Sequence, residues 1–341
     1  AVPTQAPGGL TLTDASGRTV LFEELPQRIV IAGKSSLTIV NTFYLFPEAQ
    51  ERLVGVVVGN QPVGDFVSLV DPTWDQKTVL AADAGPEQIA PLAPDVVLLR
   101  SFMADSLGRS LAELDVPVVY LDLETPEQYS RDVSILGQLL GNTARAETIR
   151  AFYRERMEGV EQAVEGLSTD QKPRVLLVQY NDQGGEVAFN VPSAAWLQSM
   201  EVELAGGVPV WTEAAQGGGW TVVSFEQIAA WDPEQVFVVS YRVDSAEIVA
   251  NLVADPQWQA LQAVQNGAIY GFPADIFSWD QPDPRWILGV TWLAGKVHPD
   301  RFPGLDMERE TIQFFGQMYG MDEAVVGTQI LPRLNLEGKV E

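Results

Sequence analysis

One segment of the chain, residues 144–166, carries the longest uninterrupted helical pattern. It contains no proline, and apolar residues such as Ile149, Phe152 and Val160 recur in it at helix-like spacings. A helix of roughly 22 residues spans about 33 Å, which is long enough to connect two domains as a stiff strut. The segment therefore predicts two domains joined by one helix, in a chain whose 341 residues suffice for two cores.

Short β-branched runs alternate with longer helical stretches on both sides of this segment, as is typical of parallel sheets covered by helices. The first part predicts strands at 28–32, 53–58, 95–100 and 116–123, with helices near 36–46, 86–93, 105–114 and 126–140. The second part predicts strands at 174–179 and 236–240, with helices at 194–204, 246–252 and 256–264. The expected fold is α/β, with two Rossmann-like lobes at 10–143 and 169–341 and a connecting helix at 144–168.

The two parts share a sequence repeat. Residues 87–97 align without a gap with residues 226–236, and each piece begins with Glu-Gln-Ile-Ala. Both pieces are typical of a short helix, a proline that ends it and the next buried strand. We interpret the repeat as a sign of two related lobes, and two ordinary helix-to-strand turns are the alternative. In both pieces the glutamate, Glu87 or Glu226, stands early in its helix, where a carboxylate suits the helix dipole.

The composition excludes several classes of protein. The formal net charge of -25 would repel nucleic-acid phosphates and anionic lipid surfaces, so nucleic acid is not an expected partner. The chain has no cysteine and a single histidine, His298, which excludes disulfides, zinc sites of the usual kind and a Ser-His-Asp triad. The glycine run at 217–219 lacks the spacing of phosphate-binding loops, so a bound nucleotide is not supported. The expected number of cofactors is none.

Several short motifs add a resemblance to these physical arguments. They are TDASGRTV at 13–20, PQRIV at 26–30, LVGV at 53–56, GPEQI at 85–89, PDVV at 94–97, WQALQAVQNG at 258–267 with Ile269 and Tyr270, and the stretch 293–302. In this order the motifs resemble the substrate-binding proteins of ABC importers for siderophores, haem, cobalamin and related metal compounds. The resemblance covers nearly the whole chain and implies the periplasmic-binding-protein fold whose lobes are joined by a single long helix.

The resemblance also implies a role. A member of this family is a monomer outside the cytoplasm that has no catalytic activity and delivers its cargo to a membrane permease. One glutamate on each lobe, here Glu87 and Glu226, docks with arginine-bearing pockets of the permease. The alternative is that both are only carboxylates at helix N-termini. Residues 1–9 are expected to be a flexible leader, and both a lipid anchor and a free exported protein are left open.

Candidate ligand-binding residues follow from the expected sheets, because ligands of open α/β sheets bind beyond the carboxyl ends of the strands. The loops there supply Lys34, Ser35, Asn60 and Phe102 in the first lobe, and Tyr180, Trp211, Trp220, Tyr241, Arg242, Trp279, Asp280 and Arg285 in the second. The aromatic residues could form walls for a planar ligand, and the arginines could bind a carboxylate or oxyanion. A tryptophan that only fills the core, and an Arg285 paired with Asp280 or Asp283, are the alternatives.

The cargo is expected to be a metal complex or an oxyanion rather than a bare ion, since bare transition metals prefer imidazole and thiolate. Direct bonding of iron to Tyr180 or Tyr241 stays open, and so does a molybdate-type oxyanion. Two lobes around a cleft also suit a glycosyltransferase or chelatase, with Asp182, Asp275, Asp280 and Asp283 as acid and base. A sensor or scavenger without a permease is a further alternative.

Overall fold

The computed structural model describes residues 9–58, 63–182, 185 and 187–336, and it consists of two compact units. Unit 1 comprises Ala1–Tyr153 and Gln317–Met321, and unit 2 comprises Arg154–Gly316 and Asp322–Glu341. The sequence assigned all of 169–341 to the second lobe, whereas the short segment Gln317–Met321 packs with unit 1. The expected leader lies outside the described residues except for Gly9.

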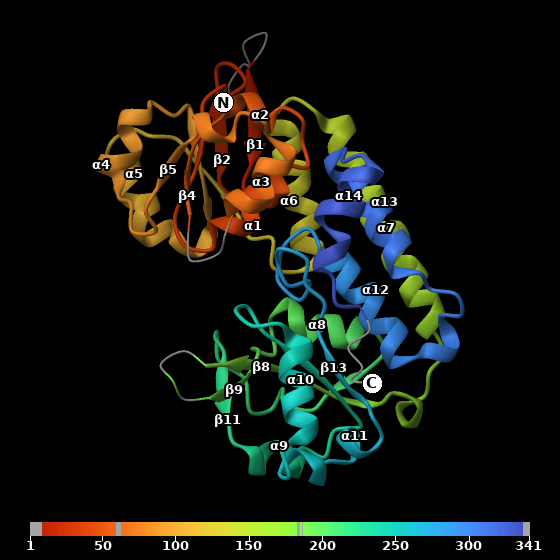
Figure 1. The fold of residues 1–341 in the computed structure, drawn as a ribbon. Helices are drawn as coiled ribbons and strands as arrows, with labels where there is room; N and C mark the ends of the chain where they lie inside the picture. Colours follow the sequence, from red (N-terminus) through yellow and green to blue (C-terminus); the bar gives the residue numbers. More distant parts are fainter. Residues whose placement is uncertain (1–8, 59–62, 183–184, 186, 337–341) are drawn as a thin grey trace. The chain divides into compact units, whose positions relative to one another are not determined.

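Unit 1 is built on a parallel sheet of five strands in the order β5-β4-β3-β6-β7. Figure 1 labels two of them, β4 and β5. The strands are β3 (Ile29–Ile31), β4 (Leu53–Val57), β5 (Thr78–Leu80), β6 (Val96–Arg100) and β7 (Val118–Leu121). β3, β6 and β7 are buried along their whole length, as expected where helices cover both faces of a parallel sheet. The predicted parallel sheet is therefore confirmed in this unit, and β5 was missed.

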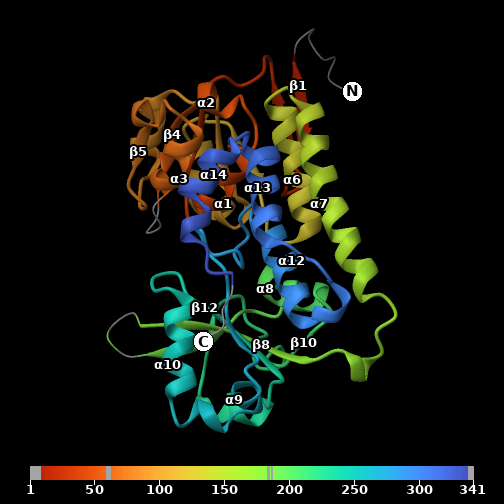
Figure 2. The same cartoon turned by 45° about the vertical axis from the view of Figure 1, so that its right-hand side comes forward.

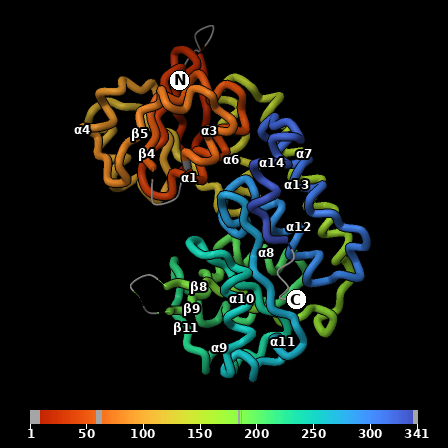
Figure 3. Tube along the Cα trace, viewed as in Figure 1, coloured from red at the N-terminus to blue at the C-terminus, as the bar shows by residue number. Residues whose placement is uncertain are grey.

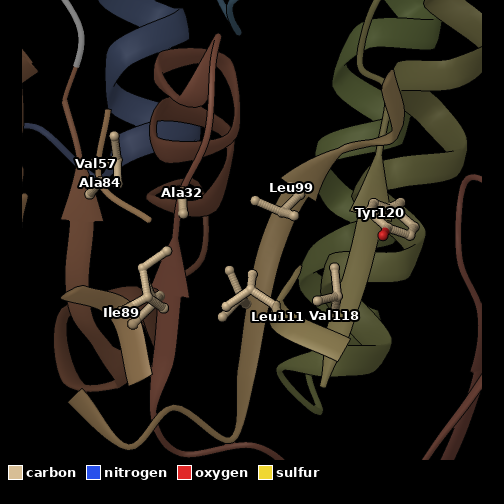
Figure 4. Packing of buried hydrophobic residues seen from close by; sticks show 10 residues of the cluster. Ala32, Val57, Ala84, Ile89, Leu99, Leu111, Val118 and Tyr120 are labelled. Atoms are coloured by element: carbon tan, nitrogen blue, oxygen red, sulfur yellow. The ribbon is translucent and has the colours of Figure 1, made fainter. Parts of the chain in front are cut away.

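An antiparallel hairpin, β1 (Leu10–Thr13) and β2 (Thr19–Phe22), precedes this sheet. The helices of unit 1 are α1 (Ser36–Phe43), α2 (Ala49–Arg52), α3 (Val63–Val70), α4 (Pro86–Ile89), α5 (Arg109–Ala112) and α6 (Pro126–Leu139). Side chains from both the sheet and its covering helices form one core, which includes Ala32, Leu99 and Leu111 (Figure 4). The predicted helix at 105–114 is instead a π-helical turn at Ala104–Gly108 followed by α5.

Unit 2 has a mixed sheet in the order β11-β9-β8-β12-β13, with β10 also paired to β8. The strands are β8 (Arg174–Asn181), β9 (Ala188–Val191), β10 (Val208–Pro209), β11 (Thr221–Val223), β12 (Gln235–Val239) and β13 (Ile269–Gly271). β10, β8, β12 and β13 are parallel, whereas β9 and β11 add an antiparallel edge. That edge was not predicted from the sequence.

The helices that lie wholly in unit 2 are α8 (Leu197–Leu204), α9 (Phe225–Trp231), α10 (Ser245–Ala254), α11 (Gln262–Gln265), α12 (Trp286–Val297) and α14 (Glu323–Gln329). Ten of the twelve residues of α12 are buried, so this helix is the centre of the core rather than a surface element. α12 packs against α8, which positions the buried polar cluster described below.

Two helices, α7 (Thr143–Val164) and α13 (Met307–Tyr319), belong partly to each unit. α7 confirms the helix predicted at 144–166. In unit 1 it lies beside α6 (Figure 2), and the hydroxyls of Tyr129 and Tyr153 are 3.0 Å apart. In unit 2, Arg156 of α7 donates to Glu310 of α13 at 3.1 Å. Figure 3 traces the chain through α12, α13 and α14 in blue. None of the helices in the described part of the chain combines the length and apolarity of a membrane span.

Candidate ligand-binding site

The carboxyl ends of β8, β12 and β13 lie at one edge of the unit 2 sheet because these strands are parallel. Tyr241 follows β12, and the loop that contains Asp280 follows β13. The Tyr241 hydroxyl donates a hydrogen bond of 2.6 Å to Oδ2 of Asp280, so two loops predicted separately meet here. This edge is where ligands of open α/β sheets bind.

Three half-buried aromatic side chains form a row at this edge: Trp196, Trp220 and Tyr241. The ring centroids of Trp196 and Trp220 are 5.7 Å apart, and those of Trp220 and Tyr241 are 6.2 Å apart, both with edge-to-face geometry. Edge-to-face contacts fix the orientation of neighbouring rings and leave part of each ring surface for a ligand. We call these three residues the aromatic row. Trp196 was missed in the sequence because it follows β9, a strand that was not predicted.

Asp280 is fully buried and is hydrogen-bonded to Tyr241, one member of the aromatic row. Besides the Tyr241 hydroxyl, its carboxylate accepts hydrogen bonds from Ser278 Oγ at 2.5 Å and Gln198 Nε2 at 3.3 Å. Burial and the neighbouring Asp280 carboxylate raise the pKa of Tyr241 well above its usual value. Asp280 itself is not exposed to a ligand.

Arg285 is also fully buried, contrary to the expectation that it binds a ligand. Its Nε is 2.8 Å from Oδ2 of Asp275, and its Nη1 is 2.9 Å from Oδ1 of Asp283. This arrangement favours the pairing that the sequence left open, with Asp283 as one of the partners. The two carboxylates neutralise the guanidinium inside unit 2, so we no longer count it among the ligand-binding candidates.

Trp211 and Trp279 are buried as well. The indole Nε1 of Trp211 donates to the Pro192 carbonyl at 2.9 Å, and that of Trp279 donates to Asp275 Oδ2 at 3.0 Å. Both indoles have their polar atom satisfied within the core. The expectation that they form ligand walls does not agree with this burial, and the alternative of tryptophans that fill the core fits better.

Tyr180 and Arg242 remain accessible at this edge. Tyr180 lies within β8 rather than in the loop after it, because pairing with β9 extends the strand, and its ring packs on Phe189 with centroids 6.1 Å apart. Arg242 is 65% exposed and has its Nε 3.9 Å from Asp182. Both residues stay candidates, Tyr180 as an aromatic surface and Arg242 as a cation partly balanced by an acid.

In unit 1 the corresponding edge carries Lys34, Ser35 and Phe102. The loops after β3 and β6 lie together, since a Cβ on Gly33 would stand 3.4 Å from Leu99 and 3.5 Å from Met103. Lys34 and Ser35 are exposed, and Ser35 has a left-handed backbone with φ of 57°. Phe102 is 60% exposed. Asn60, the fourth candidate of this lobe, lies outside the described residues.

Arg100, the last residue of β6, was not predicted to belong to this edge. It is buried, its Nη2 is 2.9 Å from Glu124 Oε2, and its guanidinium carbon is 5.8 Å from the centre of the Phe102 ring. Arg100 was not a candidate because an arginine at the end of an apolar strand is typical of a solvated strand end. The Arg100–Glu124 pair thus places a cation next to the exposed ring of Phe102.

The repeated sequence occupies equivalent places in the two units. α4 leads through Pro94 into β6, and α9 leads through Pro233 into β12. A residue in left-handed backbone stands directly before each proline, Ala93 with φ of 46° and Asp232 with φ of 45°. Two such details in common favour related lobes over chance similarity.

An arginine and an acid tie each repeat to the neighbouring strand in the same way. Asp95 accepts from the backbone N–H of Arg28 at 2.9 Å, and Glu234 accepts from that of Arg174 at 2.8 Å. The Arg28 guanidinium donates to Leu92 O at 2.6 Å, and that of Arg174 donates to Trp231 O. The two helix starts are therefore held by matching scaffolds.

Glu87 and Glu226 stand exposed in the first turns of α4 and α9. The Gly85 N–H donates to Gln88 Oε1 at 2.9 Å, and the Ser224 N–H donates to Gln227 Oε1 at 3.1 Å, so a glutamine folds back on each helix start. Hydrogen bonds at the start of α9, to its own backbone N–H first and then to Ser224, lower the pKa of Glu226. This carboxylate is thus held in its charged form on the surface.

Comparison with known proteins gives a consistent picture. Residues 44–276 match the family model described as periplasmic binding protein. A curated relative, the molybdate-binding protein MolA of Haemophilus influenzae, is 22% identical over 334 residues, which cover 90% of each chain.

Solved structures share the fold at low identity. A periplasmic solute-binding protein of Veillonella parvula is 21% identical, with a TM-score of 0.74 over 95% of this chain and 97% of that one. CeuE of Helicobacter pylori with nickel(II) bound is 15% identical, with a TM-score of 0.73 over 94% and 99% of the two chains. The predicted α/β fold is therefore confirmed as the fold that these proteins share.

Proposed function

The chain belongs to the periplasmic binding protein family, and we propose that its cargo is a metal complex of the ferric siderophore type, or a related haem or cobalamin. Members of the family bind small ligands outside the cytoplasm and deliver them to the permease of an ABC importer, without catalysing a reaction. Specific delivery to such a permease through Glu87 and Glu226 is the second part of the proposal.

The aromatic row carries the cargo assignment. Three adjoining, half-buried rings at the carboxyl edge of the unit 2 sheet suit a large ligand with apolar faces, because aromatic side chains bury much area at small entropic cost. A compact oxyanion needs converging N–H and O–H donors instead. CeuE, which shares the fold, has a metal bound in its structure.

The basic side chains near the two edges also support this choice. Arg285 is neutralised by two buried carboxylates, Arg100 is paired with Glu124, and Arg242 stands near Asp182. Cations that already have acidic partners attract a bare oxyanion weakly. Chelates whose charge is shielded by an organic shell do not depend on them.

A molybdate-type oxyanion is the second candidate. It is favoured by the relative MolA, named as a molybdate-binding protein, and by exposed Lys34 just before the start of α1. At 22% identity the relative supports the fold better than the cargo.

A ligand panel tests the cargo. Thermal shift with ferric siderophores, haem, cobalamin, molybdate and tungstate should give a clear rise for one complex, since a ligand at 100 times its Kd adds about 2.7 kcal/mol. Trp220→Ala should then weaken that complex at least tenfold, about 1.4 kcal/mol. Trp231→Ala, at the end of α9 and outside the aromatic row, is the matched control and should change the affinity less than twofold. Equal losses in both variants would contradict a role for the row.

Charge reversal tests the docking. Glu87→Lys and Glu226→Lys should each reduce uptake by proteoliposomes that contain the permease at least tenfold, while the cargo Kd stays unchanged. Glu113→Lys, an exposed acid after α5, is the control. Normal uptake with both docking residues reversed would refute this part of the proposal.

A further inference from the structure

A buried polar cluster lies directly beneath the aromatic row. It consists of Gln198 and Glu201 on α8, Tyr241 after β12, and Ser278 and Asp280 in the loop after β13; we call it the acid cluster. Glu201 and Asp280 are both fully buried. The charge of Asp280 acts on Glu201, and two buried carboxyl groups that interact in this way cannot both be ionised at low cost.

The two acids differ in their hydrogen bonds. Asp280 accepts from Ser278, Tyr241 and Gln198, which stabilise its ionised form. Among the described residues, neither oxygen of Glu201 has a hydrogen-bond partner. Burial first, and then the charge of Asp280, raise the pKa of Glu201 well above its usual value. The single proton that the pair needs therefore belongs on Glu201.

No cation compensates Glu201 within the part of the chain that the structure describes. α12 packs against α8, but the buried cation at its start, Arg285, is bound to Asp275 and Asp283. Where α12 faces Glu201 it carries Gly289, whose missing Cβ would stand 3.3 Å from Glu201 Oε1 and 2.5 Å from the Trp279 carbonyl oxygen. The only other titratable groups identified around Glu201 in the described chain are Asp280 and Tyr241.

A proton on Glu201 would complete the network. Gln198 lies one helical turn before Glu201, and its Oε1 is a buried acceptor that also has no partner among the described residues. A neutral Glu201 supplies a donor on the same face of α8 as this oxygen. Gln198 Nε2 then donates to Asp280, which accepts the Tyr241 proton as well. The donor and the acceptor of each hydrogen bond in the cluster are then fixed.

We propose that the acid cluster fixes the Tyr241 hydroxyl as a hydrogen-bond acceptor toward the cargo, so that the site selects complexes bearing N–H or O–H donors over bare oxyanions. A tyrosine has one proton to donate, and here it is given to Asp280, so a hydrogen bond between the cargo and this oxygen must be one that the oxygen accepts. This inference rests on the proposed function and narrows its cargo class. Asp280, Gln198 and Glu201 are positioning residues that act through Tyr241.

Asp280→Asn tests the direction of the hydrogen bond. The asparagine amide can donate to Tyr241 and release the phenolic proton outward, with little change in shape. We expect ferrichrome, a complex with amide donors, to bind the variant about tenfold more weakly, and molybdate to bind at least as tightly as to the wild type or better. Tyr241→Phe should lose the ferrichrome contact without any gain for molybdate. Equal losses of both ligands in Asp280→Asn would overturn the proposal.

Glu201→Gln tests the proton. The glutamine amide donates as the neutral acid does, so this variant should bind ferrichrome within twofold of the wild type. The unfolded chain ionises Glu201 above about pH 4.3, whereas the folded chain keeps the proton. The wild type therefore loses stability relative to Glu201→Gln as the pH rises, and the gap between their melting temperatures should widen from pH 5 to pH 8. A gap that does not change with pH would show an ionised Glu201 and refute the network.

These outcomes separate the two proposals. Binding of molybdate and not of any complex by the wild type refutes the donor-selective site but leaves an ABC binding protein. If the wild type binds cobalamin or another complex in place of ferrichrome, the same variants are compared with that complex. Absence of any ligand for the wild type contradicts the proposed function itself, whereas the pH dependence of Glu201→Gln still reports on the cluster.

Discussion

Arg285 illustrates how burial decides what a charged residue does. Its guanidinium is fully buried between Asp275 and Asp283, at 2.8 Å and 2.9 Å, and lies 5.1 Å from the centre of the Phe277 ring. The desolvation of three charges offsets much of their attraction, so the triad contributes little net stability. Its effect is to hold the 275–283 loop, and with it Asp280, at the end of α12.

Removal of one partner should therefore be severe. Asp275→Ala leaves the buried guanidinium with half of its compensation and is expected to lower the free energy of unfolding by about 3–5 kcal/mol, measured by urea denaturation. Asp105→Ala breaks an exposed pair with Arg109, whose side chains are 95% and 65% exposed, and should change stability by less than about 0.5 kcal/mol. Similar effects of the two substitutions would mean that the Arg285 triad is open to solvent.

The candidate residues show what sequence reasoning can and cannot supply at this scale. It located the loops beyond the strands, and with them Trp220 and Tyr241. It could not separate them from Trp211 and Trp279, because the side of a loop that faces the core depends on packing between distant segments. Glu201 was not a candidate, because a glutamate in a helix is normally solvated and its burial depends on packing with other segments.

At the scale of elements, predictability followed length and periodicity. α7 was predicted within two residues at its C-terminal end because a long helix repeats its signal over several turns. β9 and β11, with four and three residues, were missed because an antiparallel edge strand gains its stability from pairing rather than from its own composition. The missed pair is what extends β8 past Tyr180 and brings Trp196 to the site.

Gly159 offers a test of α7 as a continuous helix. It is exposed, and a Cβ at this position would meet no other atom within 4 Å. Gly159→Ala should therefore stabilise the protein by about 0.5–1 kcal/mol, because it lowers the entropy of the unfolded chain. Gly159→Pro should cost about 3 kcal/mol or more, since it removes a hydrogen bond and clashes with the preceding turn. Thermal and urea unfolding measure both; a tolerated proline would show that the helix is interrupted there.

At the scale of the whole molecule, the net charge of -25 acts on every ligand that approaches. Its field repels anions at low ionic strength and is screened over about 10 Å at 0.1 M salt. A bare oxyanion must approach against this field, whereas a neutral ferric complex is indifferent to it. The charge therefore favours the same class of cargo as the aromatic row.

Association rates can separate the two cargo classes on this basis. Stopped-flow tryptophan fluorescence should show that the association rate of molybdate rises with salt between 0.01 M and 0.3 M, by roughly threefold to tenfold. The rate for a neutral ferric hydroxamate complex should change less than twofold. A molybdate rate that falls with salt would mean that a local cationic surface around Lys34 or Arg242 outweighs the overall charge. In that case the site steers anions inward, and the oxyanion becomes the better candidate.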